Sequence, residues 1–366
     1  MTCLPPGGEI PMAVQALEPH PPGMADVARW LSAVQARVER EMAATFAPRD
    51  EDRLNPQWLA ATGSVRGHSL RQGPRLRAAM LGAAHGLVTG ASEPPPSVWR
   101  FAAGLELLHG YVLIHDEVTD VAGSRGDGPA LHRMLSPGRI GVDLSVVAGD
   151  YLFARAVEVM LDSGLPGAPA AVTYLLAICR QTSAGRFVER RCAGLPLALM
   201  TPRQVLAVAR LKTARYGFVA PLVSGAMLGG ASDAVLAPLK RAGRHLGFAY
   251  HLREELAAFF GEPLAPGEPT GEPLQGPRGF PVVAAYLRAA PAARRAMDAL
   301  WDGPLAPSAL PQARALVEAN GGRGCTERLI LRSTRLARQA LREVPQGPSS
   351  ELLDLLAVML ARRMAG

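Results

Sequence analysis

The chain has 366 residues, a formal net charge of +7, and 48% apolar but only 5% aromatic residues. Its basic residues are spread along the sequence and do not form a stripe with interleaved aromatics, which argues against nucleic acid as a partner. No uninterrupted apolar stretch is long enough to span a bilayer, which argues against stable membrane insertion.

The start of the chain and the cysteines give two further expectations. Residues 1–24 are rich in Pro and Gly and lack the basic start and apolar run of a signal peptide, so we expect a disordered tail. The four cysteines are widely spaced, with no pair at metal-ligand spacing, which is typical of a reducing, cytoplasmic location. They are Cys3, Cys179, Cys192 and Cys325.

Helical periodicity begins at residues 25–46, where apolar positions recur every three or four residues. A polar connection and a short helical segment follow. The remaining predicted helices span about 74–88, 96–120, 139–162, 168–193, 202–230, 232–260, 281–300, 306–319, 324–342 and 349–363. Residues 261–280 are too rich in Pro and Gly for a helix and predict a loop or lid. Because the long helices carry little charge, several must be buried on most sides. The sequence predicts an all-α fold, with residues 25–366 as one helical domain around a central cavity.

The most informative stretch is 105–120, LELLHGYVLIHDEVTD, in which an apolar helix ends in three acids. Asp116 and Asp120 are four residues apart and share a helix face, with Glu117 beside them. Carboxylates gathered in this way repel one another, and Mg²⁺ relieves the repulsion while keeping positions open for phosphate oxygens. A helix end that frays into water is the alternative, because acids exposed to solvent need no metal.

Other segments extend the pattern from about residue 27 to the C-terminus. They are QGPRLRAAM (72–80), AGDYLFARA (148–156), LKTARYGF (211–218) and HLGFAYHLREELAAFFGE (245–262). In this order and spacing the chain resembles the trans-isoprenyl diphosphate synthases, or polyprenyl synthetases. The resemblance implies a helical isoprenoid synthase fold that works as a homodimer. It also implies a site where Mg²⁺ grips the diphosphate of an allylic prenyl substrate.

The half of the site that binds the allylic substrate keeps its main parts. The family's first acid motif, D-D-x-x-D, corresponds here to DEVTD, which implies Asp116, Glu117 and Asp120 as metal ligands. Arg125 matches the first arginine of an adjacent pair, and in the family this first arginine meets the allylic diphosphate. Lys212 and Thr213 match a Lys-Thr pair near the diphosphate and the developing cation, and Lys212 is one of only two lysines in the chain.

Two further positions are assigned by the same resemblance. Glu189 stands at the Asp of a G-Q-x-x-D motif, where it could orient Arg125 or Lys212. His251, in the segment before the second acid motif, is expected to bind substrate.

The half of the site for the acceptor, isopentenyl diphosphate, departs from the family. Four changes fall on this pocket or its metal. Pro74 replaces a Lys, and Gly126 replaces the second arginine of the adjacent pair. Ala258 replaces the last acid of the second acid motif, and at a loop position that usually carries Lys the only nearby cation is Arg278. The resemblance still implies Arg75, Arg77 and His109 as substrate-binding residues. It also implies Glu254 and Glu255 as metal ligands.

A further residue bears on the length of the substrate. Tyr111 lies five residues before Asp116, where the family uses a bulky side chain to close the floor of the chain-binding cavity. An aromatic residue there indicates a C15–C20 ligand, although a Tyr among leucines is also common in an ordinary core.

Three functions fit these observations. The leading one is a terpene synthase-like enzyme that ionises a prenyl diphosphate and cyclises or rearranges the cation, because the allylic half is kept beside an eroded acceptor half. The second is a chain-elongating trans-prenyltransferase that makes farnesyl or geranylgeranyl diphosphate, in which Arg75, Arg77 and Arg278 compensate for the cations missing from the acceptor pocket. The third is a non-catalytic subunit that supports an active partner.

Overall fold

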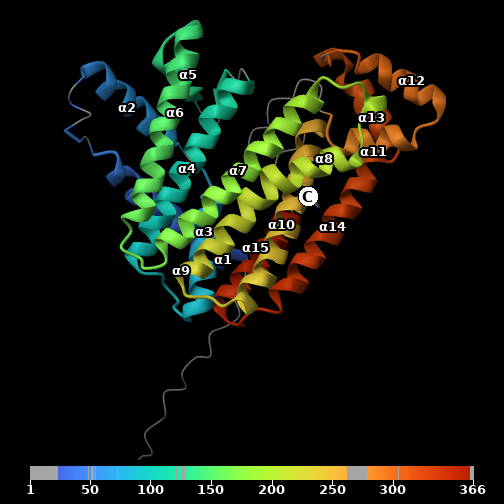
Figure 1. Cartoon of the computed structure of the whole chain (residues 1–366). Helices are drawn as coiled ribbons and strands as arrows, with labels where there is room; N and C mark the ends of the chain where they lie inside the picture. The colour runs from blue at the N-terminus through green and yellow to red at the C-terminus, as the bar shows by residue number, and fades with distance from the viewer. Residues whose placement is uncertain are drawn as a thin grey trace, which may run out of the picture.

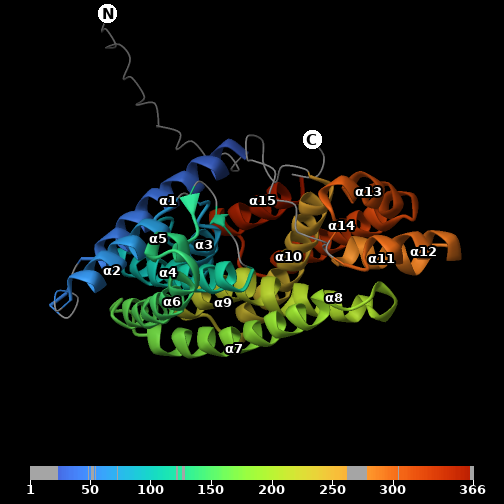
Figure 2. The same ribbon diagram turned by 90° about the horizontal axis from the view of Figure 1, so that it is seen from above.

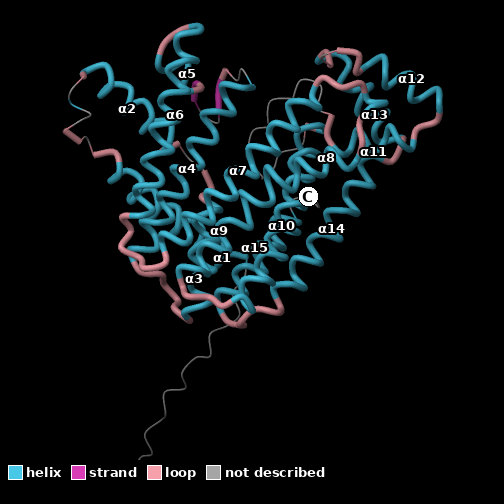
Figure 3. Tube along the Cα trace, viewed as in Figure 1, coloured by secondary structure: helices cyan, strands magenta, loops and turns pink. Residues whose placement is uncertain are grey.

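The structure is a computed structural model that describes residues 24–362, apart from 48, 51–52, 54, 72, 121–122, 126–127, 262–277 and 304. Helices dominate the described part of the chain (Figures 1 and 3). The α-helices are α1 (Met24–Thr45), α2 (Pro56–Ser69), α3 (Leu76–Thr89), α4 (Pro96–Asp120), α5 (Leu131–Leu135), α6 (Gly138–Leu161), α7 (Ala168–Ala193), α8 (Pro202–Val208), α9 (Ala220–Leu228), α10 (Asp233–Phe260), α11 (Phe280–Arg288), α12 (Pro291–Leu300), α13 (Leu310–Ala319), α14 (Gly322–Leu341) and α15 (Pro348–Arg362).

The remaining elements are short or have other helical geometry. Two 3₁₀ turns lie at η2 (Leu197–Leu199) and η4 (Pro307–Ala309), and β1 (Ser124–Arg125) pairs antiparallel with β2 (Gly128–Pro129). The segment η3 (Ala209–Val219) is a π-helix that joins α8 to α9. The all-α prediction is confirmed.

Most helix bounds follow the sequence prediction, and the exceptions have local causes. The segment predicted as one helix at 281–300 is two helices, because Ala290 precedes Pro291 and takes an extended conformation. The segment predicted at 202–230 is continuous but widens into the π-helical η3 in its middle. The predicted tail falls on residues 1–24, which lie outside the described residues except for Met24. Most of the predicted loop or lid at 261–280 lies outside them too.

The helices form two groups that diverge toward one end of the molecule. In Figure 1, α4, α5 and α6 rise on one side, and α7, α8, α10 and α14 rise on the other. Seen from above, α7 and α9 run along one side and link the two groups (Figure 2). The ends of α4, α7 and α10 that carry the acidic and basic motifs lie toward the open end.

Buried residues form three apolar clusters. The first is built around α4 and α6, with Trp99, Phe101 and Leu152 fully or almost fully buried. The second and third clusters both take residues from α10, Leu256 in one and Leu246 in the other. This sharing supports the prediction of one helical domain for residues 25–366, which stays a prediction. No helix in the described ranges combines the length and apolarity needed to cross a membrane.

Candidate active site

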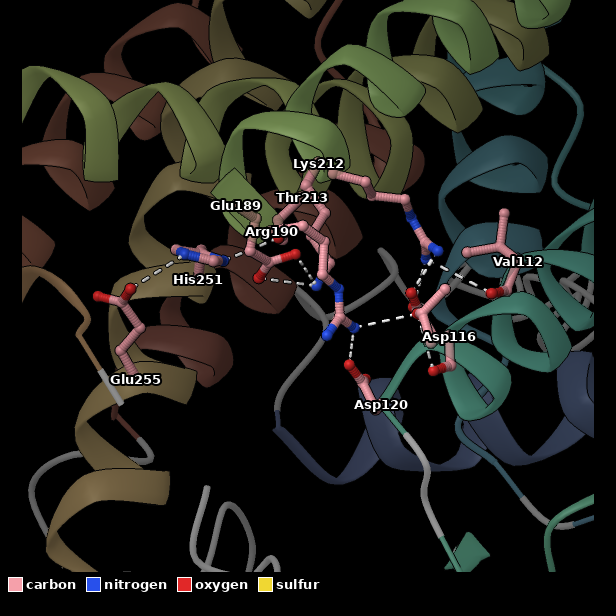
Figure 4. A network of polar contacts seen from close by, with 11 residues as sticks. Val112, Asp116, Asp120, Glu189, Arg190, Lys212, Thr213, His251 and Glu255 are labelled. Carbon is pink, nitrogen blue, oxygen red and sulfur yellow. Dashed lines mark hydrogen bonds and ion pairs between the residues drawn. The ribbon is translucent and has the colours of Figure 1, made fainter. Parts of the chain in front are cut away.

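The C-terminal end of α4 presents an acidic face to α7. Asp116 and Asp120 lie one helical turn apart, and each forms an ion pair with an arginine of α7 (Figure 4). Asp116 pairs with Arg186, and Asp120 pairs with Arg190. The arginines are also four residues apart, so the two pairs form parallel rungs between the helices. We call these two ion pairs the charge ladder.

Glu117 lies on another face of α4 and does not join the charge ladder. Its side chain is 1% exposed; Oε1 lies 2.7 Å from Nε2 of His68 on α2, and Oε2 accepts a hydrogen bond from the Leu131 amide at 2.9 Å. Each helical residue is rotated by about 100° from the one before, which turns Glu117 inward while Asp116 faces α7. The structure therefore does not bring Glu117 together with Asp116 and Asp120, and its role as a metal ligand stays a prediction.

The lysine and the acid of the next motifs meet across the contact between α7 and η3. Lys212 Nζ donates to Glu189 Oε1 at 3.0 Å and to Oε2 at 2.8 Å. Close packing allows this contact, because a Cβ on Gly185 would lie 2.7 Å from Leu211 Cβ and 3.0 Å from the Lys212 amide nitrogen. Of the two roles expected for Glu189, the structure places it on Lys212. The side chain of Arg125 lies outside the described residues.

Thr213, the neighbour of Lys212, begins a second polar chain that ends on α10. Thr213 Oγ1 lies 2.8 Å from His251 Nδ1, and His251 Nε2 lies 3.3 Å from Glu255 Oε1 (Figure 4). The other Glu255 oxygen accepts a hydrogen bond from the Phe280 amide at 3.0 Å. Burial opposes protonation of His251, but the hydrogen bond and charge of Glu255 and the charge of Glu254 raise the pKa of His251 above its ordinary value. The motif residues Thr213, His251 and Glu255 are therefore brought together.

Glu254 occupies a different environment from Glu255. Burial raises the pKa of Glu254 although the nearby charges of His251, Arg253 and Arg77 oppose the rise. Arg77 places its guanidinium carbon 5.3 Å from the ring centroid of Tyr216, and the ring of His109 lies 6.1 Å from the same ring. Arg77 and His109 thus lie in one neighbourhood around Tyr216, as expected for residues of one subsite.

The other two arginines expected at the acceptor pocket are held by the protein itself. Arg75 precedes α3 with φ of 43°, and its 9% exposed side chain bonds Glu39 Oε1 at 3.2 Å and the carbonyls of Ser69 and Arg71 at 3.2 and 2.9 Å. Arg278 donates to the carbonyls of Ala193 and Trp301 at 2.5 and 2.7 Å. Gly126 lies outside the described residues.

Tyr111 packs against the first apolar cluster. This position is compatible with the predicted role of its side chain at the floor of a chain-binding cavity, which stays a prediction. Its ring centroid lies 5.2 Å from that of Phe153 and 4.6 Å from that of His115. Burial is the main cause that raises the pKa of Tyr111. The phenol therefore stays neutral, and the side chain acts as a bulky, mostly apolar group.

The partners that sequence reasoning missed are Arg186, Arg190 and His68. Arg186 lies within GRFVE, where the motif comparison assigns a role only to Glu189, and Arg190 follows Glu189 directly. A usable signal was present, because the two arginines repeat the four-residue spacing of the two aspartates. His68 carried no such signal, since its pairing with Glu117 depends on how α2 packs on α4.

The donor set fits Mg²⁺ at α4 better than at α10. Asp116 and Asp120 offer hard oxygen donors one turn apart, and their side chains are 18% and 50% exposed. At α10, Glu255 is bonded on both oxygens, and the raised pKa of Glu254 favours its neutral form. Among the described residues, no group of three or more His, Cys, Asp or Glu side chains is placed to hold a metal ion. A metal at α4 therefore requires the arginines of the charge ladder to move.

The comparisons with known proteins agree on one family. Residues 62–316 match the family model described as polyprenyl synthetase. The chain is 30% identical over 312 residues to geranylgeranyl diphosphate synthase of Mycobacterium tuberculosis, with 84% of this chain and 83% of the relative covered. It is 26% identical over 280 residues to (2E,6E)-farnesyl diphosphate synthase of Mycobacterium bovis, with 75% and 76% covered.

Solved structures have the same fold. The structure of geranylgeranyl pyrophosphate synthase from Corynebacterium glutamicum, complexed with isoprenyl diphosphate and magnesium, matches with a TM-score of 0.78 and 25% identity, covering 92% of this chain and 99% of that chain. Geranylgeranyl pyrophosphate synthetase from Pyrococcus horikoshii matches with a TM-score of 0.79 at 18% identity, over 91% and 98% of the two chains. The architecture is therefore the helical fold of the isoprenyl diphosphate synthases. The chain belongs to the polyprenyl synthetase family and is an enzyme of isoprenoid biosynthesis.

Proposed function

We propose that the protein is a chain-elongating trans-prenyltransferase that condenses an allylic diphosphate with isopentenyl diphosphate to give farnesyl or geranylgeranyl diphosphate. The observation that carries the proposal is the 30% identity over 84% of the chain to a geranylgeranyl diphosphate synthase. This similarity favours elongation over cyclisation, which the sequence alone placed first. The loss of acceptor-side residues stays as the observation that favours cyclisation.

In this proposal, Asp116 and Asp120 hold Mg²⁺ through their carboxylate oxygens. Bound Mg²⁺ neutralises the charge that grows on a leaving diphosphate. Lys212 supplies a further cation, and its contact with Glu189 keeps Nζ in place until a phosphate oxygen replaces the carboxylate. Arg125 is proposed to contact the same diphosphate.

Thr213 and His251 are proposed to lie beside the reacting carbon. His251 carries a raised pKa, its Nδ1 contacts Thr213 Oγ1, and its Nε2 lies 3.3 Å from Glu255 Oε1, so both ring nitrogens face a polar partner. The contact with Nδ1 restricts the orientation of the Thr213 hydroxyl. A fixed hydroxyl dipole stabilises developing positive charge better than mobile water, because it needs no reorganisation.

On the acceptor side, Arg77 and His109 are the residues proposed to bind isopentenyl diphosphate. Arg77 stacks on Tyr216 and lies near Glu254, so its guanidinium is held in the interior. Tyr111 is proposed to limit the product to C15–C20, because its bulky ring packs on Phe153 against the first apolar cluster. Glu254 and Glu255 stay proposed metal ligands that must lose their present contacts first.

A homodimer is proposed on the exposed face of α6. Ile140, Leu144 and Val147 are 64%, 44% and 56% exposed and recur at helical spacing, so they form an apolar stripe. A second copy of the chain would bury this stripe by symmetry. Sedimentation analysis tests this, and a single monomeric species at micromolar concentration would contradict it. A cytoplasmic location also stays a prediction, which cell fractionation can test.

The experiment that tests the proposed function is product analysis with Mg²⁺ and labelled isopentenyl diphosphate. Geranyl, farnesyl and geranylgeranyl diphosphate are supplied in turn, each with and without the labelled acceptor. We expect a longer, labelled prenyl diphosphate only when both substrates are present. A hydrocarbon or alcohol formed without acceptor would establish cyclisation instead, and no turnover with any pairing would favour the non-catalytic subunit.

A further inference from the structure

The charge ladder neutralises the two aspartates with groups of the protein itself. Arginine stays charged at any physiological pH, so each rung joins a permanent cation to a carboxylate. Further contacts hold the guanidinium groups on α4: Arg186 donates to the Val112 carbonyl at 3.4 Å, and Arg190 donates to Thr119 Oγ1 at 3.0 Å. Both guanidinium groups are thus held against the acids of α4.

The two rungs differ in burial. In the inner rung, Arg186 is 20% exposed and Asp116 is 18% exposed. In the outer rung, Arg190 is 46% exposed and Asp120 is 50% exposed. Water and salt screen the outer rung more strongly, so the inner rung is the firmer of the two.

The ladder and a metal ion require the same carboxylate oxygens. An oxygen that accepts from a guanidinium has less electron density for a cation, and two guanidinium groups repel a divalent ion placed beside them. A diphosphate is the complementary case, because the planar guanidinium fork matches two phosphate oxygens. The neighbouring cation Lys212 is already paired with Glu189, so it does not compete with Arg186 and Arg190 for the aspartates.

We propose that Arg186 and Arg190 act by counter-ion exchange: they hold Asp116 and Asp120 in the metal-free protein and transfer to the diphosphate when metal and substrate bind together. This rests on the proposed function, in which Asp116 and Asp120 bind the metal. Metal alone then binds weakly, because it must displace both arginines with nothing to receive them. Metal with diphosphate binds well, because every displaced charge gains a new partner.

Counter-ion exchange predicts effects of opposite sign for one substitution. Arg186→Gln removes the competitor of the metal, so Mn²⁺ binding without diphosphate, measured by electron paramagnetic resonance, should tighten by about three- to tenfold. The same variant has lost a phosphate ligand, so binding of inorganic diphosphate at saturating Mg²⁺, measured by calorimetry, should weaken by about ten- to a hundredfold. Arg190→Gln should change both affinities in the same directions by smaller factors, and because Arg190 is exposed this variant separates the effect from misfolding.

Arg191→Gln is the matched control, because Arg191 lies on the same helix, is exposed and carries the same charge. It should leave both affinities within about twofold of the parent protein. Weakening of both affinities by Arg186→Gln would show a purely structural role and overturn the proposal, as would unchanged metal affinity in both Arg186→Gln and Arg190→Gln.

Asp116→Asn separates this proposal from the proposed function. Loss of Mn²⁺ binding in Asp116→Asn, together with tighter binding in Arg186→Gln, supports both. Loss in Asp116→Asn without tightening in the arginine variants overturns counter-ion exchange alone. Mn²⁺ binding that Asp116→Asn leaves unchanged would contradict the assigned metal site and the exchange together.

Discussion

The two halves of the site differ in what their cations are bonded to. On the allylic side, Lys212, Arg186 and Arg190 are each paired with a carboxylate side chain. On the acceptor side, Arg278 donates to two backbone carbonyls, and Arg75 donates to two carbonyls in addition to its ion pair with Glu39. Both halves are rich in basic residues, but the partners are of different kinds.

This difference decides which cations can bind a ligand. A cation paired with a carboxylate can exchange that partner for a phosphate, because the freed carboxylate can take a metal ion. A guanidinium that satisfies two carbonyls leaves both unpaired when it moves, which costs about 1–3 kcal/mol for each one buried. Arg186 has one contact of this kind, at 3.4 Å to Val112. The presence of an arginine in a motif is therefore a weaker guide to function than the partner it has in the fold.

The largest expected effect falls on the allylic side. Asp116→Asn should lower turnover by roughly 10²–10³-fold, because it removes a metal ligand where charge develops on the leaving diphosphate. Steady-state assays with saturating Mg²⁺ measure this. Asp143→Asn, on the exposed surface of α6, should retain parental turnover. Near-normal activity in Asp116→Asn would remove the basis for treating this half as the catalytic one.

A smaller effect separates the two acceptor-side arginines. Arg77→Gln should raise the KM for isopentenyl diphosphate by about ten- to a hundredfold, because a charge-assisted contact is lost, with little change in melting temperature. Arg75→Gln should instead lower the melting temperature and leave that KM within about twofold, since its bonds are internal. The opposite assignment, with Arg75 controlling KM, would show that its carbonyl contacts open during binding.

Tyr111→Ala should change the product more than the rate. Removing the ring that packs on Phe153 opens space at the end of the apolar region, so chain length should increase. Chromatography of the dephosphorylated products measures this. Tyr151→Ala, on the neighbouring helix and packed against Trp58, is the control and should leave product length unchanged. An unaltered product in Tyr111→Ala would reduce Tyr111 to an ordinary core residue.

The smallest effect is on the pH dependence of stability. The pKa of His251 is raised in the folded protein above 6.5, so the stabilisation from its bound proton is complete below that pH and is lost as pH rises through the folded-state pKa. The raised pKa of Glu254 acts in the same direction from 4.5 upward. In chelator-treated protein, His251→Gln should reduce the fall in melting temperature between pH 6 and 9 by about 2 °C. An unchanged slope would show that the Thr213–His251–Glu255 contacts do not favour the charged ring.

The helices could be predicted from the sequence, because apolar periodicity and Gly or Pro punctuation are local properties. Pro291 was visible too, but the prediction of one helix at 281–300 passed over it. The π-helical geometry of η3 could not be predicted, because no local sequence pattern marks it. Gly185 of α7 and Gly247 of α10 allow these two helices to pack closely against η3. A Cβ on Gly247, for example, would lie 2.5 Å from Ala214 Cα. Lys212 and Thr213 lie in this segment.

Within the site, sequence reasoning found the acids and missed their partners. The spacing of Asp116 and Asp120 fixes a shared face, whereas Glu117 was grouped with them by adjacency although helix rotation turns it toward His68. The four-residue spacing of Arg186 and Arg190 repeats that of the aspartates, but which face of α4 they meet depends on how α7 packs on α4. Residues on one helix are related by geometry, and residues on different helices are related only by the fold.

The most direct test of the central claim is a single-turnover experiment with enzyme in excess over labelled geranyl diphosphate. Reactions contain Mg²⁺ and are run with and without isopentenyl diphosphate, and the label is followed by chromatography. An elongating enzyme with a retained allylic half and a reduced acceptor half should convert the label to a longer diphosphate only when isopentenyl diphosphate is present. The conversion rate should approach its maximum only at high concentrations of isopentenyl diphosphate. Conversion of the label to a hydrocarbon or alcohol without acceptor would contradict the account.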